Sequence, residues 1–115
     1  MTTVAQLKRF EKAVKKYLPM VPEWEVAVMM KKGKGWRAQC QMDSQSKLAA
    51  ILLDSHINPK TLTEKELEML ALHEVLHLVL FDLARIAEVD GRNTAVDRIE
   101  HEIINRICSF LTPKL

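Results

Sequence analysis

The sequence predicts an α+β fold in which an N-terminal helix is followed by a small three-stranded sheet and then by two helices. Three observations support this order. Apolar residues recur at helical spacing in segment 3–18, they alternate or run unbroken in three short segments between residues 23 and 53, and they return to helical spacing beyond residue 63. The 115 residues, 48% of them hydrophobic, suit one compact domain over 1–115.

The composition leaves the class of partner open. Charged residues make up 28% of the chain and the net charge is only +2, so disorder is not expected. No apolar run is long enough to span a membrane, and the first 20 residues lack the apolar core of a signal peptide. We therefore expect no membrane partner and a cytoplasmic protein, in which Cys40 and Cys108 are reduced and buried.

The first helix is expected over residues 3–18. Thr3 and Gln6 have the spacing of a capping box, and Pro19 ends the helix. The polar side of the helix carries a basic stripe, formed by Lys8, Arg9, Lys12, Lys15 and Lys16. Such a stripe is usually a solvated face, so we expect no nucleic-acid partner. A nucleic-acid role that also uses the basic turn at 31–34 is the alternative.

Three strands are expected next. In segments 23–30 and 36–42, larger apolar side chains stand at every second position, which is typical of half-buried strands. The intervening residues of segment 36–42 are polar, so one face of that strand is expected to be exposed to solvent. Segment 48–53 is continuously apolar, which predicts a strand covered on both sides.

The second half of the chain is expected to be helical. Thr63 and Glu66 have capping-box spacing at the start of a helix whose apolar periodicity runs past Leu83. A break at Asp90-Gly91 separates this helix from a last helix over residues 94–111.

A metal site is predicted inside the first of these two helices, where His73, Glu74 and His77 form an HExxH motif. Residues four apart share one helix face, so both imidazoles can reach one ion, and neutral imidazole suits zinc. Glu74 lies about 100° around the helix from His73, which favours a role as general base for the attacking water. The other residues on this side are apolar, namely Leu70, Leu80, Phe81 and Ala84. Burying these polar groups there is costly without a partner such as a metal.

A third ligand is expected from the last helix, because a catalytic zinc usually has three protein ligands. The apolar face of that helix is predicted to consist of Val96, Ile99, Ile103, Ile107 and Phe110, flanked by Ile104 and Leu111. Helical spacing places Glu100 inside this face, where a carboxylate needs a cation. We therefore predict Glu100 as the third ligand. A salt bridge from Glu100 to a buried arginine and ligation by His101, at the edge of the face, are the alternatives.

Three further residues are candidates for roles beside the metal. Ligating histidines usually donate their second N–H to a carboxylate or carbonyl, which Asp97 or Asn105 could accept. His56, in the loop after the third strand, is a candidate contact to a substrate carbonyl. For each of the three, a plain surface or capping role is the alternative.

These residues resemble those of the HExxH zinc metallopeptidases called zincins. The metzincin branch continues as HExxHxxGxxH, whereas this chain has Leu80 in place of the glycine and Leu83 in place of the third histidine. The chain looks more like the gluzincin branch, whose third ligand is a glutamate on a downstream helix, here Glu100. Its layout is similar to the minigluzincins, and segment 100–106 looks like the last helix of small HExxH proteins of phages and prophages.

This resemblance implies a zinc-dependent metallopeptidase with one zinc per chain, a peptide or protein substrate, and Glu74 as general base. The chain departs from larger gluzincins at Ile104, where those proteins often have an aspartate that holds a histidine ligand. No tyrosine or histidine of the chain matches their transition-state stabilisers. The alternative function is a zinc-stabilised binding module without catalysis, and an open rather than blocked fourth metal position distinguishes the two. The sequence indicates neither a cleavage preference nor an oligomeric state.

Overall fold

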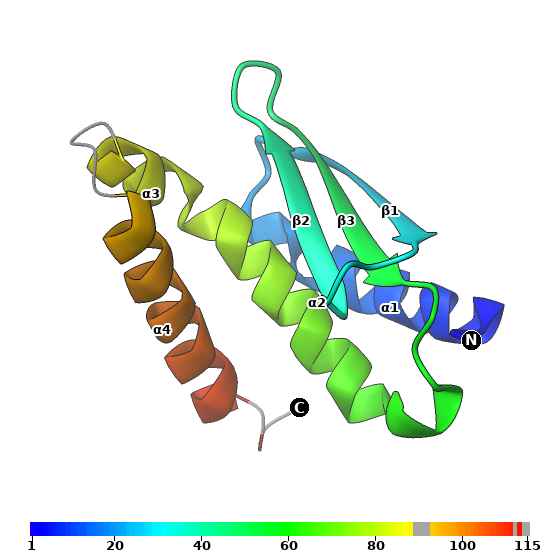
Figure 1. Ribbon diagram of the computed structural model, residues 1–115. Coiled ribbons are helices and arrows are strands. Elements are labelled where there is room, and N and C mark those ends of the chain that lie inside the picture. The colour runs from blue at the N-terminus through cyan, green and yellow to red at the C-terminus, as the bar shows by residue number, and fades with distance from the viewer. Residues whose placement is uncertain (89–92, 112, 114–115) are drawn as a thin grey trace.

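The computed structural model describes residues 1–88, 93–111 and 113, and it confirms the α+β class (Figure 1). Its elements, in chain order, are α1 (Val4–Tyr17), η1 (Leu18–Met20), β1 (Glu25–Lys31), β2 (Ala38–Asp43), β3 (Leu48–Asp54), η2 (Pro59–Thr61), α2 (Glu64–Val79), α3 (Phe81–Glu88) and α4 (Asn93–Leu111). The break expected at Asp90-Gly91 lies outside the described residues. Among the helices described, none has both the length and the apolar character needed to cross a membrane.

The sheet has the strand order β1-β3-β2, so the last strand in the sequence is the central one. Strand β1 pairs with β3 in parallel, and β2 pairs with β3 in antiparallel fashion. The β2–β3 turn includes Lys47 in the left-handed region, with φ 57°. Because β2 has only β3 as a neighbour, one edge of β2 is unpaired by any described strand.

Helices α1 and α2 pack against one face of the sheet and form the main core with it (Figure 1). Ile51 and Leu53 of β3 are fully buried against this layer, which includes Phe10 of α1 and Val75 of α2. Leu52 points to the opposite face and is also buried, at 2% exposure. No helix of the described chain covers that face. We attribute the burial of Leu52 to its partners across the strands, which flank it in register.

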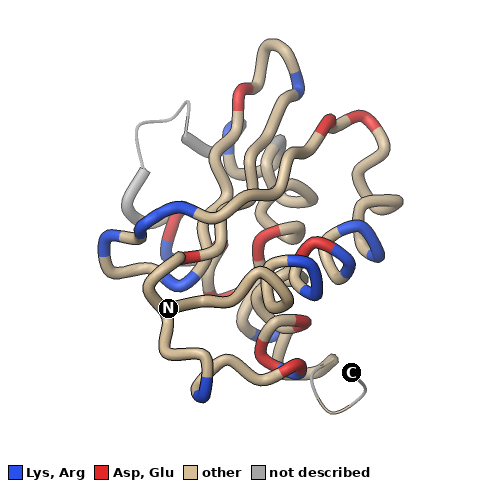
Figure 2. The backbone as a smooth tube through the Cα atoms, turned by 90° about the vertical axis from the view of Figure 1, so that its right-hand side faces the viewer, with Lys and Arg blue, Asp and Glu red and all other residues tan. Residues whose placement is uncertain are grey.

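The basic stripe on α1 is partly neutralised by acidic residues. Arg9 pairs with Glu64 at 3.1 Å and Lys16 with Glu68 at 3.6 Å, both carboxylates belonging to α2. Basic and acidic residues are interspersed along the chain in Figure 2. Both ion pairs lie at the surface, where such pairs stabilise a fold only weakly.

The capping residues predicted at the start of α1 are confirmed. Thr3 accepts a hydrogen bond from the Gln6 backbone, and the Gln6 side chain accepts one from the Thr3 backbone. The Gln6 amide also donates to the carbonyls of Pro59 and Leu62, which joins α1 to the segment leading into α2. Thr63 then caps α2 by accepting from the backbone of Glu66.

The prediction of one unbroken helix from residue 63 past Leu83 was wrong. Helix α2 ends at Val79, and Leu80 leaves the helical region with φ −91° and ψ 0° before α3 begins. The chain changes direction at this interruption, and the ring of Phe81 packs on that of Trp24 with the ring centroids 5.2 Å apart. This aromatic contact to the sheet layer favours the bend over a straight continuation.

The face by which α4 packs also differs from the prediction. Ile104 and Cys108 are the buried residues, packed against Leu72 and Leu76 of α2. Two residues assigned to the apolar face, Ile99 and Phe110, are instead 48% and 67% exposed. The helix is thus rotated, and the side that includes residues 101, 104 and 108 faces α2.

Candidate metal centre

Three sides of helix α2 face, respectively, the main core, helix α4 and the candidate metal centre. One side packs in the main core, through Leu67, Ala71, Val75 and Leu78. A second side meets α4 through Leu72 and Leu76. The remaining side presents His73 and His77, whose ring centroids are 5.1 Å apart, as expected for residues one turn apart.

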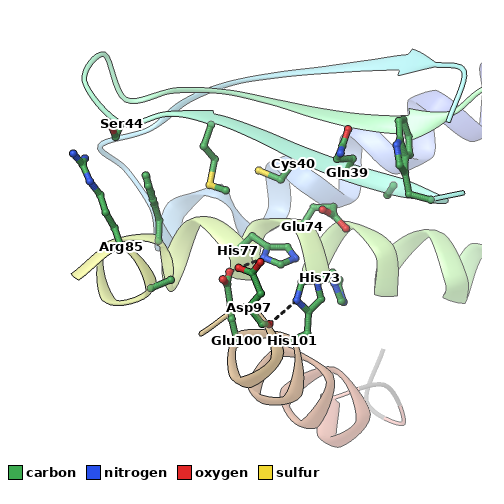
Figure 3. A pocket seen from close by; sticks show the side chains of 15 residues that line it. Gln39, Cys40, Ser44, His73, Glu74, His77, Arg85, Asp97, Glu100 and His101 are labelled. Atoms are coloured by element: carbon green, nitrogen blue, oxygen red, sulfur yellow. Dashed lines mark hydrogen bonds and ion pairs between the residues drawn. The ribbon is translucent and has the colours of Figure 1, made fainter. Parts of the chain in front are cut away.

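A third histidine from α4 completes a group that could hold one metal ion. Ring nitrogens of His73, His77 and His101 all lie within 4.8 Å of one another. Zinc bound tetrahedrally at about 2.0–2.1 Å would bring such nitrogens to about 3.3 Å apart, so only a small inward movement of the rings is required. In Figure 3 the three histidines come from the two facing helices.

Two of the three imidazoles are held by acceptors on their Nδ1 atoms. Glu100 Oε1 lies 2.7 Å from Nδ1 of His77, and both side chains are only 13% exposed. The Asp97 backbone oxygen lies 2.9 Å from Nδ1 of His101. An acceptor there favours the tautomer with a proton on Nδ1, which leaves the Nε2 lone pair free for a metal.

The geometry favours His101, the alternative third ligand, over Glu100. Glu100 contacts Nδ1 of His77 and does not belong to the group of close ring nitrogens formed by the three histidines. The rotation of α4 explains this, because His101, Ile104 and Cys108 at positions i, i+3 and i+7 share the face that meets α2. The ligand role predicted for Glu100 therefore has a competitor, His101, whose ring lies closer to the other two histidines.

Glu74 lies beside the histidines in a water-poor setting. The residue is 4% exposed, and burial raises the pKa of its carboxyl from 4.5 to about 7. No hydrogen bond or ion pair joins Glu74 to another described residue. A carboxylate with such a pKa and no competing partner is well suited to exchange protons near neutral pH.

His73 is kept neutral by its surroundings. Burial, together with the neighbouring His77 and His101, lowers its pKa from 6.5 to about 4. A neutral imidazole has the lone pair that a metal needs, so no proton has to be displaced from His73 at neutral pH.

A cavity of about 660 Å³ opens beside these groups, between β2 and the helices. Its walls include the three histidines, Glu74, Glu100 and Asp97, and β2 contributes Ala38, Gln39, Cys40 and Met42. Burial, with Glu74 and Glu100 nearby, raises the pKa of Cys40 to about 12, so this wall carries a neutral thiol. The histidines therefore face a space that can admit a ligand.

The other candidates fall into different places. Asp97 contributes its backbone oxygen to His101 instead of its carboxylate, and Asn105 is exposed outside the cavity wall. His56 is exposed, with Nδ1 2.8 Å from the Ser55 hydroxyl, and does not line the cavity. Cys40 was missed as a wall residue, although the alternation of its strand assigned it to one face with Ala38 and Met42.

A scan against protein-family models, a search of the curated proteins and a search of the solved structures each found no match for this chain. The resemblance to gluzincins accordingly stays an expectation from the sequence.

Proposed function

We propose that this protein is a zinc-dependent metallopeptidase whose metal ligands are His73, His77 and His101. The observation that carries the proposal is the convergence of three imidazoles on the wall of an open cavity, beside a buried glutamate. Three nitrogen ligands from protein suit zinc, although ligand type alone also admits other divalent metals.

The open cavity supports catalysis over a purely structural site. Structural zinc sites usually have four protein ligands, whereas catalytic sites have three and one position open to solvent or substrate. No fourth His, Cys, Asp or Glu joins the three histidines within the described part of the chain. A binding module stabilised by zinc would be expected to close that position.

Each residue of the site then has a role that its position suggests. When zinc is bound, it lowers the pKa of water and polarises a substrate carbonyl. Glu74 accepts the proton of the attacking water and returns it to the leaving amine. Glu100 holds the ring of His77, and the Asp97 backbone holds His101. The unpaired edge of β2, which lines the cavity, offers backbone groups to an extended peptide.

The proposal is tested with Glu74→Gln, a substitution that preserves shape and removes the base. We expect the variant to bind one zinc per chain, as the wild type does, and to lose hydrolysis of an unstructured protein such as casein. Glu102→Gln, on the exposed side of α4, is the matched control and keeps both properties. Retained activity in Glu74→Gln would contradict the role of Glu74. A zinc-loaded wild type that cleaves nothing would favour the non-catalytic binding module.

A further inference from the structure

One end of the cavity carries a fixed positive charge that the proposed chemistry does not use. Arg85, in α3, lines the cavity and is the only lysine or arginine among its fifteen described wall residues. In Figure 3 its side chain points toward the β2–β3 turn, where Ser44 is labelled, while His73 and His77 lie further along the cavity. The cation is therefore set apart from the metal centre.

This guanidinium has no carboxylate partner in the described part of the chain. No ion pair involving Arg85 is recorded there, although other arginines of the chain are paired, such as Arg9, Arg37 and Arg98. The carboxylates of the cavity lie around the histidines, where Glu100 is already bound to His77. The described wall thus has its carboxylates around the histidines and its one guanidinium at one end.

The direction of β2 connects the two regions. This edge strand lines the cavity from Ala38 to Met42 and ends at Asp43, next to the turn with Ser44. A peptide lying along its free edge would pass the histidines and lead toward Arg85. A group on one side of the scissile bond would then meet the guanidinium.

We propose that Arg85 binds a carboxylate of the peptide substrate and so makes the enzyme selective for acidic peptides. This inference rests on the proposed peptidase function. Arginine presents several N–H donors in a planar fork that matches a carboxylate, and charge-assisted hydrogen bonds are the strong ones. The carboxylate is either an acidic side chain or the C-terminal carboxyl group, since both have the same chemistry. Among the described wall residues, Arg85 is the one permanently charged cation that could bind such a carboxylate away from the histidines.

The test uses fluorogenic peptides on zinc-loaded protein. The set places Asp, Ala or Lys at each position flanking the cleaved bond, and each peptide is made with a free and an amidated C-terminus. Because Arg85 is exposed, we expect the wild type to prefer a carboxylate-bearing peptide by up to about fivefold in kcat/KM. Arg85→Gln loses this preference while cleaving the amidated Ala peptides as before, and Arg85→Glu prefers Lys. Arg98→Gln, whose guanidinium pairs with Glu102 on the exposed side of α4, is the control and retains the preference.

The outcomes separate the two sources of the carboxylate. A preference that follows Asp in amidated peptides identifies a side chain, and one that disappears on amidation identifies the C-terminus. An acidic preference that survives in Arg85→Glu, or a wild type that cleaves all peptides equally, would overturn the role of Arg85 while leaving the peptidase intact.

A binding measurement tests Arg85 without relying on catalysis. The same peptides are titrated into Glu74→Gln and into the double variant that also carries Arg85→Gln, with fluorescence anisotropy as the readout. We expect the second substitution to weaken binding of the acidic peptide by up to about fivefold and to leave that of the amidated Ala peptide unchanged. If the wild type cleaves no peptide but this difference is present, the proposed function fails and the carboxylate site stands. Equal binding of all peptides would refute the site.

Discussion

Burial of the Glu74 carboxyl makes a prediction about stability that is independent of any substrate. In the unfolded chain this group ionises near its ordinary pKa of 4.5, whereas in the folded protein its pKa is raised to about 7. Between these two values the folded state holds a proton that the unfolded state has released. The ionisation of Glu74 therefore makes the metal-free protein less stable as pH rises from about 4.5 to about 7.

The size of this effect follows from the two pKa values. A tenfold change in proton affinity corresponds to about 1.4 kcal/mol, so moving the pKa from 4.5 to about 7 disfavours the charged folded form by about 3 kcal/mol. No discount for solvent screening is required, because the residue is only 4% exposed. Glutamine has a similar shape and no charge at any pH. Glu74→Gln should therefore gain about 3 kcal/mol over the wild type between pH 4.5 and pH 8.

The assay is urea unfolding of both proteins in EDTA at several pH values. The difference in unfolding free energy between variant and wild type is the quantity of interest, because the titration of His73 is common to both proteins and largely cancels. Glu102→Gln, with a half-exposed side chain, should show little pH-dependent difference. A difference for Glu74→Gln that stays constant from pH 4.5 to pH 8 would show that the carboxyl is not desolvated as described.

Two further predictions concern packing and metal binding. Ile104→Ala should lower the unfolding free energy by about 2–5 kcal/mol in urea titrations, because Ile104 is fully buried between α2 and α4. Ile99→Ala, at a site that is 48% exposed, should lower it far less. Equal losses in the two variants would contradict the orientation of α4. Zinc at about 1,000 times its Kd should raise the unfolding free energy by about 4 kcal/mol over the value measured in EDTA. If zinc raises neither the melting temperature nor the unfolding free energy in urea, the folded chain does not form the proposed site.

The features of the fold that could be predicted are those that depend only on residues close together in the chain. The capping box of Thr3 and Gln6 and the order of elements depend on neighbours in the chain, and both are confirmed. The end of α2 at Val79 did not follow from periodicity, because Leu80 and Phe81 continue the apolar pattern. The contact of Phe81 with Trp24, a residue distant in sequence, favours the bend.

The part of the site that lies on α2 alone could be predicted from the sequence, whereas the ligand from α4 could not. The pairing of His73 with His77 follows from helix geometry alone. The choice between Glu100 and His101 depends on how α4 rotates against α2, and α4 has more apolar residues than one face can bury. Packing of Ile104 and Cys108 fixes that rotation, and it turns His101 toward the other histidines while Glu100 contacts His77. Such a rotation is a property of two helices together, so a single segment does not predict it.

Zinc affinity in two single variants tests the central claim most directly. Competition with a chromophoric chelator would be measured for the wild type, His101→Ala and Glu100→Gln. The arrangement of the three histidines predicts one zinc per chain in the wild type. It also predicts loss of about 10- to 100-fold in affinity for Glu100→Gln, which removes a group that orients His77, and a larger loss for His101→Ala. Wild-type affinity in His101→Ala together with loss of zinc in Glu100→Gln would contradict it and make Glu100 the third ligand.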